Sequence, residues 1–200
     1  RVKMAQYHCS ESEARDIARR ETFQRVCIFG LGTTGMFIGD LIRQRYPDAK
    51  IVVFGRNESK LHDFTFADET HLVDDVSEVE LVDHAFECVG GEGSVAAIEQ
   101  IIDRINPEGT VSLLGVSENN VPINTRMVLE KGLRLFGSSR SGREDFERTV
   151  ALYREHPEVV DYLGALVGDV VKAHQVADLS AAFETDIRKP MGKTVIKWEM

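Results

Sequence analysis

Short apolar runs alternate with amphipathic stretches along most of the chain. The run Val26–Phe29 precedes a segment, Thr33–Arg45, whose apolar residues recur at helical spacing. A second run, Ile51–Phe54, is apolar without interruption, which is typical of a strand buried on both faces of a parallel sheet. The pattern predicts an α/β fold with a doubly wound parallel sheet.

The same pattern predicts the remaining elements and the division of the chain. We expect strands over 25–29, 50–54, 70–73, 84–89, 110–114 and 133–136, and helices over 33–45, 94–105, part of 121–131 and 145–154. Pro107 and Gly109 break the second helix and Pro157 marks the end of the last. We expect an amphipathic lead-in helix over 1–24, a cofactor-binding domain over 25–165, and a strand–helix–strand appendage over 166–200.

A glycine motif links the first strand to the first helix. Gly30, Gly32 and Gly35 have the G-x-G-x-x-G spacing, and a second strand follows the helix. Gly30 permits a tight turn, Gly32 lets a diphosphate approach the backbone, and Gly35 allows close packing of the helix. Thr33 and Thr34 begin that helix, whose free N–H groups favour phosphate. This context predicts a dinucleotide site in a Rossmann-type fold, and a glycine-rich turn without a ligand is the alternative.

The end of the second strand indicates which dinucleotide binds. Gly55 is followed by Arg56 and Asn57, with Lys60 close behind, and no acidic residue stands at the tip itself. An acid at this place usually binds the free ribose of NAD, whereas an arginine suits the 2′-phosphate of NADP. We therefore expect NADP(H), the alternative being that Arg56 and Lys60 are ordinary loop charges.

Two more strand ends carry glycine and are candidate walls of the cofactor site. Ligands of open parallel sheets lie outside the carboxyl ends of the strands. The residues expected there are Cys88, Val89, Gly90, Gly115, Val116, Ser117 and, after the sixth strand, Ser138.

The charge balance argues against nucleic acid as a partner. The chain has 33 acidic against 24 basic residues, a formal net charge of -9, whereas phosphate backbones need a basic face. We find no run of the roughly 20 apolar residues that a membrane helix needs. Cys9, Cys27 and Cys88 have no paired spacing, which predicts reduced thiols and a cytoplasmic location. The pair Asp74 and Asp75 is interpreted as a solvated turn.

The ordered motifs resemble the cofactor half of the medium-chain, zinc-type alcohol dehydrogenases over essentially the whole chain. Two blocks, Ile123–Gly132 and Gly137–Phe146, are similar to the NADPH-dependent ribulose-5-phosphate reductases. The resemblance implies reduction of ribulose 5-phosphate to ribitol 5-phosphate for teichoic acid or capsule synthesis. Arg140 and Arg143 are expected in a flexible Gly/Ser loop and are candidates to bind the sugar phosphate, with surface charge as the alternative.

The resemblance also implies what the chain lacks. Family members carry a metal-binding domain before the cofactor domain, so zinc and the catalytic residues are expected there. We expect no zinc site and no catalytic residues in this chain, and we expect the chain alone to be inactive. The start at Arg1 suggests a trimmed piece, and the family implies a homodimer through the Leu133–Phe136 edge strand.

Two other functional classes fit part of the sequence. A non-catalytic NADP-binding module, sensing redox state or supporting assembly, would bind the cofactor without turnover. A methyltransferase also carries a glycine-rich first loop, but it usually needs an acid at the second strand tip, where this chain has Gly55-Arg56.

Overall fold

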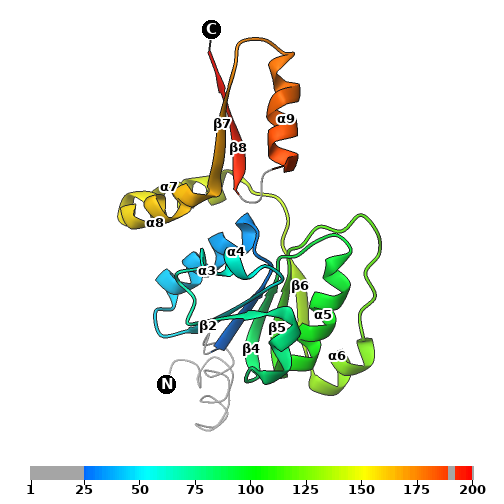
Figure 1. Ribbon diagram of the computed structural model, residues 1–200. Helices are drawn as coiled ribbons and strands as arrows, with labels where there is room; N and C mark the ends of the chain where they lie inside the picture. The colour runs from blue at the N-terminus through cyan, green and yellow to red at the C-terminus, as the bar shows by residue number, and fades with distance from the viewer. Residues whose placement is uncertain (1–24, 189–191, 200) are drawn as a thin grey trace. The chain divides into compact units, whose positions relative to one another are not determined.

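The computed structural model describes residues 25–188 and 192–199 (Figure 1). The lead-in helix expected over residues 1–24 lies outside the described residues. Contacts between residues divide the described chain into two units. The first comprises residues 25–31 and 38–138, and the second comprises 32–37 and the described residues from 139 onward.

The first unit is built on a six-stranded, wholly parallel sheet. Its strand order is β3-β2-β1-β4-β5-β6, so the chain builds outward from β1 in one direction and then from β4 in the other. This order confirms the doubly wound Rossmann topology, with its switch point between β1 and β4. The strands are β1 (Arg25–Phe29), β2 (Lys50–Gly55), β3 (Glu69–Leu72), β4 (Val82–Glu87), β5 (Ile105–Leu113) and β6 (Arg134–Gly137).

Helices connect successive strands on opposite faces of this sheet. Right-handed crossovers in the two winding directions put α3 on one face and α5 on the other, as Figure 1 shows. The connecting elements are α3 (Thr33–Arg45), α4 (Glu58–Leu61), the 3-10 helix η1 (Val73–Glu78), α5 (Gly93–Arg104) and α6 (Thr125–Lys131). None of the described helices is long and apolar enough to cross a membrane.

The hydrophobic core of the first unit includes buried residues of β1, β2, β4, β5 and α5. All five residues of β1 are buried, as the apolar run predicts. The rings of Phe29 and Phe54 stack with centroids 4.6 Å apart. On the α5 side, Ile98, Ile101 and Ile102 complete the cluster. The ends of these strands therefore rest on a packed base, which fixes the positions of the turns that follow.

The second unit contains the expected strand–helix–strand. Strands β7 (Val167–Ala173) and β8 (Lys193–Trp198) pair in parallel, and α9 (Asp178–Arg188) connects them. Before them come α7 (Arg143–Glu155), α8 (Pro157–Leu163) and the 3-10 helix η2 (Gly164–Leu166). The domain boundary at residue 165 stays a prediction.

Several element boundaries differ from the sequence prediction. β5 begins at Ile105 instead of Thr110, because Pro107 lies in an irregularity where Val82 pairs with Ile105 and His84 with Thr110. Proline is tolerated at such a bulge. Pro157 does follow the end of α7, but it also begins α8, which the sequence pattern did not predict.

The helix α7 begins two residues earlier than expected. The Asp145 carboxylate accepts the Gly142 N–H at 2.8 Å, which caps the helix at Gly142. Arg143 is therefore the first residue of α7 and does not lie in a Gly/Ser loop.

Candidate functional site

The ends of β2, β1 and β4 are tied together at Gly30. Its N–H donates to the Phe54 carbonyl oxygen at 3.1 Å, and the Cys88 N–H donates to Phe29 at 2.8 Å. Gly30 has φ 117°, and a Cβ added there would lie 2.7 Å from the Cys88 carbonyl oxygen. Only glycine fits this crossing, so the turn expected at Gly30 is confirmed with a steric reason.

The turns after β4 and β5 also touch each other. The Gly91 N–H donates to the Val116 carbonyl oxygen at 2.8 Å. Gly90 has φ 71°, and an added Cβ would lie 2.9 Å from the same oxygen. The Ser117 hydroxyl lies 3.0 Å from the Gly91 carbonyl oxygen, to which it can donate. Strand ends that are separate in the sequence thus form one continuous edge.

A buried carboxylate that the sequence analysis did not single out lies under this edge. Glu87, the last residue of β4, is 1% exposed. Its Oε1 accepts hydrogen bonds from the backbone of Val89 and Gly90 and from the buried Ser94 hydroxyl, at 2.9, 3.1 and 3.0 Å. Its Oε2 accepts the Gly115 N–H at 3.1 Å. The available signal was an acidic residue between the apolar residues Phe86 and Cys88 of the predicted strand.

The glycine turn before α3 leaves its backbone accessible. Gly32 is exposed, and a Cβ built on it would meet nothing within 4 Å. Its carbonyl oxygen accepts the Met36 N–H at 3.1 Å, so the helix is already formed at this point. Thr33, Thr34 and Gly35 therefore form the first turn of a 13-residue helix, where unpaired N–H groups favour an anion.

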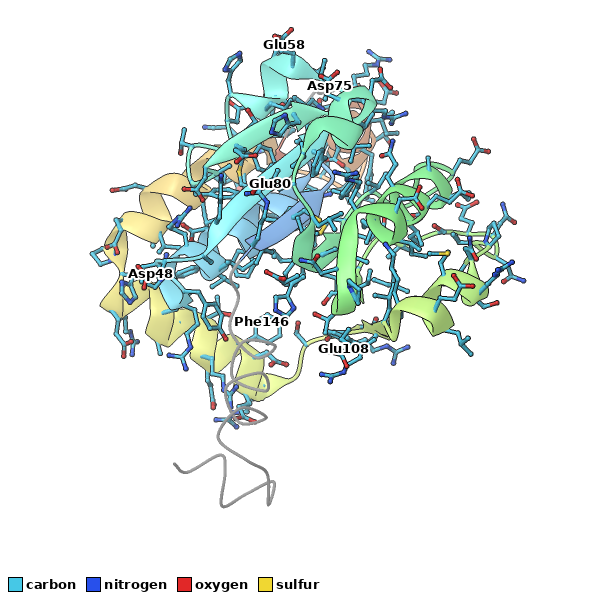
Figure 2. The ribbon with its side chains drawn as sticks, turned by 90° about the horizontal axis from the view of Figure 1, so that it is seen from below. Asp48, Glu58, Asp75, Glu80, Glu108 and Phe146 are labelled. Atoms are coloured by element: carbon cyan, nitrogen blue, oxygen red, sulfur yellow. The ribbon has the colours of Figure 1, made fainter. Side chains whose placement is uncertain are left out.

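Of the residues that follow β2, Asn57 has a structural role and Arg56 is an exposed charge. Asn57 caps α4 by accepting the Lys60 N–H at 3.2 Å and the Ser59 hydroxyl at 2.7 Å. Arg56 is exposed and forms no ion pair with any described residue. Glu58, two residues after Arg56, is an exposed acid that was not among the predicted site residues, and its side chain projects away from the ribbon in Figure 2.

The side chains along the edge are mostly apolar or neutral. Val116 is 86% exposed and offers an apolar surface at the end of β5. Burial, together with the neighbouring Glu87 carboxylate, raises the pKa of the Cys88 thiol to about 12. Burial also raises the pKa of Cys27. Both thiols are therefore protonated at neutral pH and do not act as thiolates.

The candidate phosphate-binding arginines belong to the second unit. Arg143 pairs with Glu147 one turn along α7 at 2.6 Å, and Arg140 is exposed with φ 68°. Ser138 is the exposed last residue of the first unit. The roles of these three residues stay predictions, as does pairing of two chains through β6, although β6 does lie at the edge of the sheet.

The described residues do not fit a metal site. Among them, no group of three or more His, Cys, Asp or Glu side chains is placed to hold an ion. Asp74 and Asp75, which could have formed part of one, are exposed in η1 (Figure 2).

A comparison with protein families identifies the class. Residues 46–155 match the model of the zinc-binding dehydrogenase family. The chain belongs to that family. The match covers more than half of the chain, and it confirms the resemblance to the zinc-type dehydrogenases.

Individual relatives show which members of this family the chain resembles. The chain is 47% identical to the ribulose-5-phosphate reductase of Bacillus spizizenii over 199 residues, covering 100% of this chain and 58% of that protein. It is 48% identical to ribulose-5-phosphate reductase 1 of Staphylococcus aureus, covering 94% of this chain and 54% of that one. The chain thus spans little more than half the length of these relatives.

A solved structure gives the same likeness in three dimensions. The crystal structure of S. aureus TarJ in complex with NADPH superposes with a TM-score of 0.87 at 46% identity, covering 94% of this chain and 60% of that one. The expected fold and the similarity to ribulose-5-phosphate reductases are both confirmed.

Proposed function

We propose that this chain is the cofactor-binding part of an NADPH-dependent reductase that converts ribulose 5-phosphate to ribitol 5-phosphate. The observation that carries the proposal is the glycine-lined edge on both sides of the β1/β4 switch point. In open α/β sheets this is where a dinucleotide lies. The relatives named ribulose-5-phosphate reductase and the NADPH-bound TarJ structure supply the cofactor and the substrate class.

The residues present fit a dinucleotide. The exposed backbone at Gly32 leaves room for a diphosphate, and the first turn of α3 offers N–H groups and a positive dipole end to it. The Arg56 guanidinium suits the adenosine 2′-phosphate, because it can donate two parallel hydrogen bonds. Lys60 adds a second positive charge in α4.

The remainder of the cofactor runs toward β4 and β5. Its nicotinamide half lies along Cys88–Gly90 and Gly115–Ser117, with the exposed Val116 as an apolar surface beside it. When bound, NADPH supplies the hydride for reduction of the sugar-phosphate carbonyl. The protein's own part is to fix the position of the donor and to select the phosphorylated cofactor.

Cofactor selection by Arg56 is tested by titration with NADPH and NADH, following the fluorescence of the reduced nicotinamide. Removing a charged partner of a phosphate costs about 1–3 kcal/mol, so Arg56→Ala should weaken NADPH binding by roughly tenfold or more. NADH binding should change little. The matched control is Arg45→Ala. It removes an exposed guanidinium from the last residue of α3, at the opposite end of that helix from the proposed diphosphate site.

Two results would count against this reading. Equal affinity of the unchanged chain for NADPH and NADH would remove the phosphate argument. An equal loss for both cofactors in Arg56→Ala would mean that the side chain acts on the fold and not on the phosphate. Turnover of ribulose 5-phosphate is measured on the complete protein from the loss of NADPH absorbance.

A further inference from the structure

One buried side chain contacts both the turn after β4 and the turn after β5, in addition to the hydrogen bonds that join Gly91 to Val116 and Ser117. The Glu87 carboxylate accepts four hydrogen bonds: two from its own turn, one from Ser94 in the first turn of α5, and one from Gly115, which lies 28 residues further along the chain. A Cβ added to Gly115 would meet both carboxylate oxygens. The carboxylate thus fills the space between the two turns.

Both carboxylate oxygens of Glu87 face hydrogen-bond donors, so this site requires a side chain that accepts through both of its terminal atoms. An ionised carboxylate has two oxygens that only accept, and here each oxygen faces N–H or O–H donors. A glutamine of the same shape would turn an NH₂ group toward the donors of one turn. The donors on that side would lose their side-chain acceptor and would face a donor, although the Gly115 N–H also donates to the Glu87 main-chain oxygen at 3.0 Å.

A second set of contacts extends the network toward the surface. Ser94 is 1% exposed and links Glu87 to Ser117, whose hydroxyl oxygen lies 3.2 Å from that of Ser94. Ser117 also contacts the Gly91 carbonyl oxygen. The buried acid is therefore connected to the exposed end of the β5 turn through a single hydroxyl.

We infer that Glu87 is a positioning residue for the nicotinamide half of the cofactor. The inference rests on the proposed function, in which Arg56 binds the adenosine phosphate at β2 and the other half lies along the turns after β4 and β5. Glu87 holds only the second of these regions. Changing it should therefore weaken contacts to the nicotinamide half and leave those to the adenosine half intact.

The test compares the whole cofactor with its adenosine half. The chain and its Glu87→Gln variant are titrated with NADPH and with adenosine 2′,5′-bisphosphate, by fluorescence and by calorimetry. We expect Glu87→Gln to weaken NADPH binding by roughly tenfold, the effect of about one lost charged hydrogen bond. Binding of the bisphosphate should stay within twofold, and the fluorescence enhancement of bound NADPH should fall.

Glu99→Gln is the matched control. It makes the same substitution on α5 at an exposed position, and both affinities should equal those of the unchanged chain. Should Glu87→Gln not fold, Ser94→Ala removes one donor to the same carboxylate and the link to Ser117. It should give the same selective loss at a smaller, severalfold size.

The outcomes separate this inference from the proposed function. Failure of the unchanged chain to bind NADPH would overturn both. Normal binding by the unchanged chain, with an equal loss for both ligands or no loss for either in the variants, would overturn the role of Glu87 alone.

Discussion

At the amino-terminal ends of β1, β2 and β3, the carboxylate of Glu69 is surrounded by basic side chains. Its carboxylate pairs with Arg25 at 3.0 Å, with Lys50, and with the His71 ring at 3.2 Å. The hydrogen bond from Lys50, against the opposing effect of partial burial, and the contacts with His71 and Arg25 lower the pKa of Glu69 to about 2. The first residues of β1, β2 and β3 are thereby joined.

This pairing predicts a specific pH dependence of stability. Because the folded pKa is about 2 against 4.5 for an unperturbed glutamate, the carboxylate stabilises the fold fully above pH 4.5. The contribution is lost as pH falls from 4.5 toward 2. The free energy of unfolding of Glu69→Gln should therefore lie below that of the unchanged chain at pH 7, and the gap should close over this window.

Urea unfolding at a series of pH values measures the gap. Glu80→Gln is the control, because Glu80 contacts the same Arg25 at 3.4 Å but its side chain is 83% exposed. Its gap should be small at every pH. A gap for Glu69→Gln that is constant from pH 7 to pH 2 would contradict the assignment.

At the scale of elements, the end of α5 depends on a residue from α6. The Lys131 ammonium donates to the carbonyl oxygens of Ile102, Asp103 and Ile105, at 2.6, 3.1 and 3.0 Å. The last carbonyls of a helix have no partner within it, and a positive charge there also complements the helix dipole. Lys131 thus connects α6 to the end of α5 and to the start of β5 by hydrogen bonds.

Replacing Lys131 should cost more than its position on a short helix suggests. Lys131→Met keeps the length of the side chain but removes all three donors, so we expect a loss of about 1–3 kcal/mol in the free energy of unfolding. Arg126→Met on the same helix removes an exposed pair with Glu130 and should cost less than about 0.5 kcal/mol. Equal effects in urea unfolding would show that Lys131 acts as an ordinary surface charge.

Elements that depend on local pattern could be predicted from the sequence, and those that depend on distant contacts could not. The bounds of β1 and α3 agree with the apolar spacing and the glycine motif. The early start of α7 required knowing that Asp145 reaches back to Gly142, and the bulge in β5 places Glu108 at φ 63°.

The same contrast applies to the candidate site. Gly30 follows from the motif, because its turn is local. In the sequence, Glu87 is not distinguished from other strand residues. Its role depends on the pairing of β4 with β5, which brings Gly115 beside it. A contact across 28 residues leaves no periodic trace in the sequence.

At the scale of the whole molecule, the central strands of the first unit are far more buried than the strands of the second unit. All of β1 and nearly all of β2 are buried. In β7 and β8, which form a two-stranded sheet, Ala173 alone is buried, while Val170 and Trp198 are about half exposed. Both sheets have parallel hydrogen-bonded ladders, so they differ in burial and in strand number and not in the type of pairing.

This difference predicts the order of hydrogen exchange in the chain. A two-stranded sheet has little stability of its own, and local opening is easiest where few apolar side chains are buried. Amides of β1, β2 and β4 should therefore exchange only on unfolding of the first unit, whereas those of β7 and β8 should exchange through smaller openings. Exchange followed by mass spectrometry on peptides from each strand gives the comparison.

The dependence on urea provides the internal control for this prediction. Exchange by global unfolding accelerates steeply with urea, because it exposes much surface, and exchange by local opening does not. The β1 and β2 peptides should show the steep dependence and the β7 and β8 peptides a shallow one. Uniformly slow exchange with one common urea dependence would mean that both units unfold together, and the burial of individual strands would then not set their stability.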